Sequence, residues 1–118
     1  MHRTMSQPSE IDVDAERAQA LIDAGDVQLV DVREAYEWDA GRLAGARHIE
    51  LQRLPEEAGT LDRERPVLFY CRVGSRSGMA DGAFRRAGFD AYSLDGGLMA
   101  WEARGLPLDP PDGRVAQH

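Results

Sequence analysis

The stretch VLFYCRVGSRSGMADGAFRRAG, residues 67–88, decides the fold class. Its first four residues form a continuous apolar run after Pro66, which is typical of a strand covered on both faces. From Arg76 onward, apolar residues recur at helical spacing until Gly88, which predicts a helix that ends at a glycine. A buried strand followed at once by a helix is the repeating unit of α/β proteins.

The rest of the chain alternates in the same way between short apolar runs and segments of helical period. Strands are predicted at residues 11–13, 28–32, 47–51, 67–70 and 91–94. Helices are predicted between Asp14 and Gly25, at 34–39, at 51–61, from Arg76 to Gly88 and around Leu98 and Trp101. This alternation is typical of a mainly parallel sheet flanked by helices, so the expected fold class is α/β with five strands.

Length and composition favour a single domain. The chain has 118 residues without an internal repeat or a Gly/Ser linker. Only its ends, such as the Pro-, Asp- and Gly-rich residues 109–118, have the composition of flexible segments. We expect a domain at residues 10–108 between two flexible tails, 1–9 and 109–118.

Two of the predicted helices indicate which side faces the core. The apolar side of the helix that begins at Arg76 comprises Met79, Ala80, Ala83, Phe84 and Ala87. Gly78 and Gly82 lie four residues apart on this helix, so they expose its backbone on one side and allow close packing there. In the shorter helix at 34–39, Ala35 and Trp38 are expected to face the core.

The charge of the chain argues against several partners. Fourteen basic residues, all of them Arg, against twenty-one acidic residues give a formal net charge of −7 at pH 7. Such a surface repels phosphate backbones and acidic lipid headgroups, so we expect neither nucleic acid nor a membrane as a partner. The longest apolar runs are also far shorter than the roughly 18 residues that indicate a membrane span.

The cysteine and histidine counts bear on cofactors and location. The single cysteine, Cys71, forms no internal disulfide, and the first residues contain no apolar signal core, so a reducing cytoplasm is expected. The three histidines, His2, His48 and His118, lie far apart in the sequence, which argues against a metal site. We therefore expect no metal and no cofactor.

Cys71 lies at the turn from the predicted strand 67–70 into the next helix. In open α/β sheets, sites form beyond the carboxyl ends of the strands, where a loop points several N–H groups into one concavity. Gly74 lets the loop curve tightly, and Arg72 and Arg76 add two positive charges. Such surroundings stabilise a thiolate, so we expect a nucleophile. The alternative is a small buried apolar residue, as many free cysteines are.

Several segments together resemble the rhodanese-like sulfurtransferase domains over residues 10–108. The loop YCRVGSRS at 70–77 matches the family's C-x-x-G-x-R pattern. The other matching segments are LVDVRE at 29–34, GRLAGA at 41–46, LDGG at 94–97, and Trp101 followed by GLP at 105–107. One position departs from the pattern, since Arg42 stands where the family usually has histidine.

The resemblance implies a three-layer α/β domain and a sulfur-transfer reaction. Cys71 would attack the outer sulfur of a donor such as thiosulfate, sulfite would leave, and Cys71 would hold a persulfide until cyanide or a thiol takes the sulfur. Cys71 is then the catalytic residue, and the expected substrate-binding residues are Arg72, Val73, Gly74, Ser75, Arg76 and Ser77. The expected partners are a small sulfur donor and a thiol or cyanide acceptor, with a sulfur-accepting protein as a further candidate.

Asp31 and Arg33 are candidates for structural support of the site. They stand at the end of the predicted strand 28–32, near the expected position of the cysteine loop. An ion pair that fixes the strand end is favoured over direct contact with the substrate.

Two other functions stay open on the sequence. Cysteine phosphatases and arsenate reductases have loops that resemble C-x-x-x-x-x-R, whereas four residues separate Cys71 from Arg76, and a tetrahedral oxyanion needs a wider loop than one sulfur atom. The other alternative is a sulfur carrier or regulatory module that acts through a partner protein. Arg72, rather than glycine, after the cysteine favours thiosulfate over mercaptopyruvate as the donor.

Overall fold

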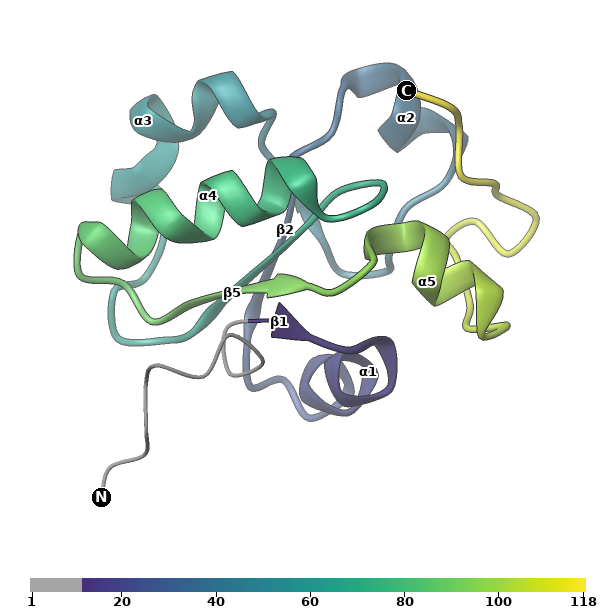
Figure 1. Cartoon of the computed structure of the whole chain (residues 1–118), viewed down its shortest axis with the longest axis horizontal. Helices are drawn as coiled ribbons and strands as arrows, with labels where there is room; N and C mark the ends of the chain where they lie inside the picture. Colours follow the sequence, from purple (N-terminus) through teal and green to yellow (C-terminus); the bar gives the residue numbers. More distant parts are fainter. Residues whose placement is uncertain (1–11) are drawn as a thin grey trace.

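Parallel strands form one sheet through the middle of the molecule (Figure 1). The computed structural model describes residues 12–118, so the predicted tail at 1–9 and the strand position of Ile11 lie outside the described residues. The strands within 12–118 are β1 (Asp12–Val13), β2 (Gln28–Asp31), β3 (Arg47–His48), β4 (Val67–Tyr70) and β5 (Ala91–Leu94). Their order is β1-β5-β4-β2-β3, and each neighbouring pair runs parallel.

Helices cover both faces of this sheet, which confirms the expected three-layer α/β fold (Figure 1). The longer ones are α1 (Ala15–Asp23), α2 (Ala35–Ala40), α4 (Ser75–Arg86) and α5 (Gly97–Ala103). The predicted helix at 51–61 is broken into η2 (Leu51–Arg53), α3 (Leu54–Glu57) and η3 (Ala58–Thr60). Pro55 and Gly59 account for the break, because each of them disfavours a continuous helix.

The alternation of side chains along β4 sends neighbouring residues to opposite faces. Phe69 and Cys71 pack in one core cluster with Leu54 of α3 and Phe84 of α4. Leu68 and Tyr70 pack in the other cluster, with residues of α1 and α5. All four residues of β4 are buried, as expected for a central parallel strand. Cys71 therefore continues the strand's alternation and points toward the face that α4 covers.

The predicted inner face of α2 is wrong. Ala35 is exposed, whereas Glu37 is fully buried and Trp38 is half-buried against the ring of His48. The reason is electrostatic, because Glu37 forms an ion pair with Arg76 at the start of α4. A hydrophobic pattern does not indicate which charged side chain finds a partner inside.

One expectation for the inner face of α4 is also wrong. Met79, expected on the core side, is 65% exposed, although Ala80 and Phe84 are buried. No close packing occurs at the two helix glycines: a Cβ at Gly78 would have no neighbour within 4 Å, and one at Gly82 would meet only the tip of a side chain at 3.6 Å. These residues of α4 line a groove whose other wall includes residues of α3.

The segment at 109–118, for which a flexible tail is expected, makes defined contacts with the domain in this structure. The backbones of Arg42 and Asp109 pair in both directions, at 3.0 and 2.7 Å, and the N–H of Arg114 donates to the carbonyl of Ala40 at 2.9 Å. Ala116 is buried. The composition of this segment does indicate an irregular structure, but backbone hydrogen bonds can fasten such a segment whatever its composition.

Candidate active site

Two backbone N–H groups and one hydroxyl group converge on the sulfur atom of Cys71. The N–H of Gly74 lies 3.1 Å from Sγ, and the N–H of Ser77 lies 3.4 Å away. The hydroxyl of Ser77 lies 3.5 Å from the same atom. Cys71 itself is fully buried. Donors of this kind stabilise negative charge on sulfur, which is the form in which a cysteine is nucleophilic.

The start of α4 places these donors. Gly74 precedes the helix with a backbone φ of 110°, in the region that favours glycine, so the loop turns sharply after leaving β4. The helix then begins at Ser75, and its first N–H groups have no partner inside the helix. The positive end of the helix dipole therefore faces the sulfur and adds to the effect of the direct donors.

The start of α5 fastens the other side of the same loop. The N–H of Leu98 donates to the carbonyl of Cys71 at 2.9 Å, and the N–H of Met99 donates to the carbonyl of Arg72 at 3.0 Å. Gly97 makes this approach possible, because a Cβ there would lie 2.5 Å from the carbonyl group of Arg72. Its φ of 60° also favours glycine. The quoted segment LDGG is thus the point where the last helix clamps the cysteine loop.

Arg76 is engaged within the protein. Its guanidinium forms two hydrogen bonds with the carboxylate of Glu37, at 2.8 and 3.0 Å. Burial alone would raise the pKa of Glu37, but the hydrogen bonds and charge of Arg76 together with the N–H of Glu34 outweigh it, so this pKa lies below its ordinary value. The same hydrogen bonds raise the pKa of Arg76. The charge expected to meet a substrate anion is therefore balanced by a buried carboxylate.

The side chains of Arg72, Val73 and Ser75 make no hydrogen bond or ion pair among the described residues. Arg72 is half-buried, and its Nε is buried without a partner in the described part of the chain. Val73 and Ser75 are exposed. Of the two loop arginines, Arg72 is therefore the one whose charge is available to an anion.

Asp31 and Arg33 form a fully buried ion pair with an N–O distance of 2.7 Å. Arg33 also donates to the carbonyl of Gly41 at 2.8 Å, which ties the end of β2 to the end of α2. Burial alone would lower the pKa of Arg33, but the partner carboxylate outweighs it, so the pKa lies above its ordinary value. The hydrogen bonds of this pair brace the carboxyl end of β2 and do not reach the Cys71 sulfur.

Arg42, the departure from the family pattern, lies outside the cysteine loop. Its guanidinium stacks over the ring of Trp38 at 4.9 Å and donates to the carbonyl of Asp109 at 2.8 Å. It therefore joins α2 to the C-terminal segment.

Sequence reasoning missed two residues that surround the site. Glu37 is the partner of Arg76, and Ser93 of β5 places its hydroxyl oxygen 2.7 Å from that of Ser77. Ser93 is 2% exposed. The signals available were a glutamate on the inner side of a short helix and a serine within an apolar strand. Neither signal names its partner, because both partners are distant in sequence.

The described residues contain no assembled metal site and no membrane-spanning helix. No three His, Cys, Asp or Glu side chains within 12–118 gather in a way that could hold a metal ion. No helix in that range has both the length and the apolar character needed to cross a bilayer.

Known proteins resemble this chain both in sequence and in structure. The model of the rhodanese-like domain family matches residues 14–104. A sulfurtransferase of Allochromatium vinosum is 34% identical over 104 residues, which cover 86% of this chain and 97% of that protein. The thiosulfate sulfurtransferase GlpE of Pseudomonas aeruginosa is 34% identical over 101 residues, 85% of this chain and 90% of that one. The crystal structure of a rhodanese-related protein from Thermoplasma volcanium superposes with a TM-score of 0.77 at 26% identity and covers 82% of this chain and 95% of that one.

Proposed function

The chain belongs to the rhodanese-like domain family, and on that premise we propose that it is a sulfurtransferase that carries a sulfane sulfur on Cys71. Thiosulfate is the proposed donor, and cyanide or a thiol is the proposed acceptor. A relative whose name specifies thiosulfate supports this choice of donor. We also propose a cytoplasmic location, as expected for a chain with one free thiol.

In the first step the Cys71 thiolate attacks the outer sulfur of thiosulfate. A bond forms between the two sulfur atoms, the sulfur–sulfur bond of thiosulfate breaks, and its electron pair leaves with sulfite. Cys71 then carries a persulfide. The unpaired guanidinium of Arg72 is the charge best placed to attract the dianion, since Arg76 is bonded to Glu37.

In the second step cyanide attacks the outer sulfur of the persulfide. The sulfur–sulfur bond breaks, thiocyanate leaves, and the electron pair returns to Cys71 as a thiolate. No general base is required, because the loop donors stabilise the thiolate in both steps. Gly74 and Ser77 supply those donors from fixed backbone positions, so little reorganisation accompanies each step.

The observation that carries the proposal is the convergence of two N–H donors and the Ser77 hydroxyl on the only thiol of the chain. The short loop also supports sulfur transfer over phosphate chemistry. Gly74, three residues after Cys71, donates directly to the sulfur, which leaves the loop closed around one atom.

The test is incubation with thiosulfate followed by measurement of the intact mass. We expect wild type to gain the mass of one sulfur atom and to release thiocyanate when cyanide is added. Cys71→Ser should gain no mass and form no thiocyanate. Thiocyanate formation by the serine variant would overturn the assignment of Cys71. Hydrolysis of an aryl phosphate without any sulfur transfer would instead favour the phosphatase alternative.

A further inference from the structure

The exposed apolar side chains of this molecule gather around the cysteine loop. Within residues 12–118, the large apolar side chains that stand clearly in solvent are Tyr36 (53% exposed), Val73 (50%), Met79 (65%) and Met99 (38%). They come from four different segments of the chain. We refer to these four residues as the apolar rim.

Backbone hydrogen bonds and the ion pair between Arg76 and Glu37 indicate that each rim residue lies beside the cysteine loop. Val73 belongs to the loop, and the N–H of Met99 donates to the carbonyl of its neighbour, Arg72. Met79 follows Arg76 by three residues, so both lie on one side of the first turns of α4. Tyr36 precedes Glu37, which binds Arg76. Apolar side chains that gather on a protein surface typically mark a contact site.

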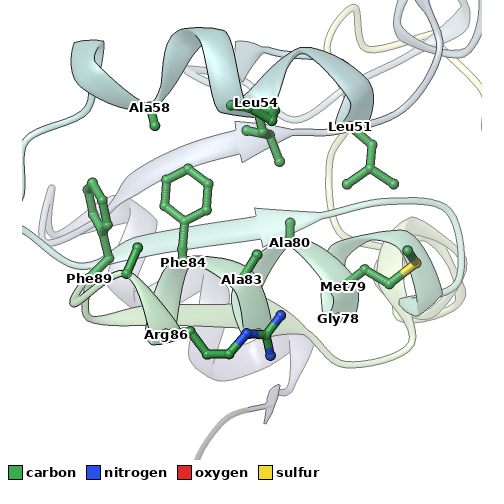
Figure 2. A pocket seen from close by; sticks show the side chains of 13 residues that line it. Leu51, Leu54, Ala58, Gly78, Met79, Ala80, Ala83, Phe84, Arg86 and Phe89 are labelled. Atoms are coloured by element: carbon green, nitrogen blue, oxygen red, sulfur yellow. The ribbon is translucent and has the colours of Figure 1, made fainter.

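The rim continues into a groove between α3 and α4. The groove has a volume of about 570 Å³ and an almost entirely apolar lining. Figure 2 shows Met79 and Leu51 facing each other at one end of the groove, and Phe89 and Ala58 at the other end. Met79 belongs to both the rim and the groove, so the two form one surface. The bare backbone of Gly78 and Gly82 lies within this surface.

Unpaired positive charge accompanies this apolar surface, although the chain as a whole is acidic. Arg86 lines the groove, and its side chain has no hydrogen bond or ion pair among the described residues (Figure 2). Arg72 supplies a second unpaired guanidinium beside the rim. The glutamates of α3, Glu56 and Glu57, are in contrast paired with arginines. A partner that fits this surface combines apolar groups with negative charge.

We propose that the rim and the groove form the docking surface for a polypeptide whose cysteine thiol accepts the sulfur, with apolar and acidic residues beside that cysteine. This inference rests on the proposed function and specifies its acceptor. A small anion such as cyanide uses neither the apolar area nor the groove. A polypeptide buries both, and the removal of apolar surface from water favours its binding.

The full burial of Cys71 sets a further requirement on this acceptor. The accepting thiol has to protrude from its own chain to reach the persulfide between the rim residues. Its thiolate attacks the outer sulfur, the sulfur–sulfur bond to Cys71 breaks, and the electron pair returns to Cys71. The acceptor leaves as a persulfide, so sulfur moves without a net oxidant or reductant.

The test uses two synthetic peptides of equal length with one central cysteine each. One peptide has leucine and glutamate around the cysteine, and the other has serine and lysine. We expect wild type, charged with thiosulfate, to transfer sulfur to the leucine–glutamate peptide with a kcat/KM about tenfold higher than to the other, a difference common for a few desolvated contacts. Thiocyanate formation with cyanide is measured in parallel.

Surface variants then separate docking from chemistry. Met79→Ser and Arg86→Gln should each lower kcat/KM for the leucine–glutamate peptide by about threefold to tenfold and leave thiocyanate formation unchanged. Arg17→Gln is the matched control, because it removes the same charge from an exposed site on α1. It should change neither rate.

Equal use of the two peptides by wild type, with thiocyanate formation intact, would overturn the docking proposal and leave the proposed function in place. Loss of the peptide preference in Arg17→Gln would also overturn it, because general charge would then be the cause. Absence of any thiocyanate in wild type would overturn the proposed function itself.

Discussion

Ser77 has one hydroxyl proton and three possible acceptors for it. The acceptors are the sulfur of Cys71, the carbonyl of Gly74 at 3.2 Å and the hydroxyl of Ser93. The carbonyl of Gly74 already accepts the N–H of Gly78 at 2.9 Å. If Ser93 donates to Ser77, the proton of Ser77 is free to point at the sulfur. Ser93 therefore acts through Ser77 as a positioning residue.

Removal of the Ser93 hydroxyl should weaken the stabilisation of the thiolate. In Ser93→Ala we expect iodoacetamide alkylation of Cys71 at pH 7 to slow and kcat/KM for thiosulfate to fall, each by about threefold to tenfold, the scale of one hydrogen bond. Ser93→Thr keeps the hydroxyl and should restore both rates. An unchanged alkylation rate in the alanine variant would show that Ser77 points at the sulfur without help.

At the scale of elements, the ion pair between α2 and α4 is the most consequential contact that the sequence conceals. Glu37 is fully buried, and the side chain of Arg76 is only 15% exposed. The pair joins two helices that are far apart in the chain, and the N–H of Glu34 also donates to the carboxylate of Glu37 at 3.0 Å. Loss of one partner leaves the other without compensation in a place with little water.

Glu37→Gln should therefore lower the free energy of unfolding by about 2–4 kcal/mol at pH 7. Because the pKa of Glu37 is lowered by its partner, its contribution is present above the ordinary glutamate pKa. The contribution disappears as pH falls through the lower value in the folded protein. Urea unfolding at pH 7 and at pH 3 measures this difference. A stability gap between wild type and variant that widened toward pH 3 would contradict the assignment.

The backbone hydrogen bonds that join α5 to the cysteine loop lead to a second prediction at the scale of elements. Gly97→Ala should push away the carbonyl of Arg72 and with it the loop, so thiocyanate formation should fall at least about tenfold and stability by about 1–3 kcal/mol. Gly105→Ala is the matched control, because Gly105 has a φ of 72° but open space around it. It should lose about 1 kcal/mol of stability and keep its activity. Equal loss of activity in both variants would exclude a specific clamp.

At the scale of the whole molecule, a second buried carboxyl group makes stability depend on pH. Asp81 on α4 is 4% exposed, and burial raises its pKa to about 6. Arg85 lies 3.9 Å away and opposes the rise, whereas Asp12 adds to it. Between pH 3.8 and about 6 the folded protein therefore keeps a proton on Asp81 that the unfolded chain has already released. The ionised group costs stability above that range.

Asp81→Asn should accordingly stabilise the fold by about 1–3 kcal/mol at pH 7.5 and by much less at pH 4. Urea unfolding of the two proteins at both pH values measures the change. A gain of equal size at pH 4 would show that the charge of Asp81 is not the cause.

The sequence indicates most of the fold but only part of the site. Hydrophobic period and glycine positions place the strands and helices well, because burial of apolar side chains decides them. The position of Cys71 follows from the same pattern, since sites form at the ends of parallel strands. The predicted inner face of α2 is wrong, because Glu37 enters the interior through an ion pair. The predicted inner face of α4 is wrong at Met79, which stays exposed beside the groove. Contacts between residues distant in sequence, such as Ser77 with Ser93, leave no local signal.

The pairing of β1 with β5 has a consequence for how the chain folds as it is made. Asp12 lies in register with Ser93, and Val13 with Leu94. The first described strand, β1, can therefore pair only after β5 has been made. A ribosome delivers β2, β3 and β4 earlier, and these three can pair among themselves before β5 emerges. The sheet is completed only when β5 inserts between β4 and β1. The sheet can therefore close only after β5 has been made, and the residues of α5 that hold the cysteine loop are made later still.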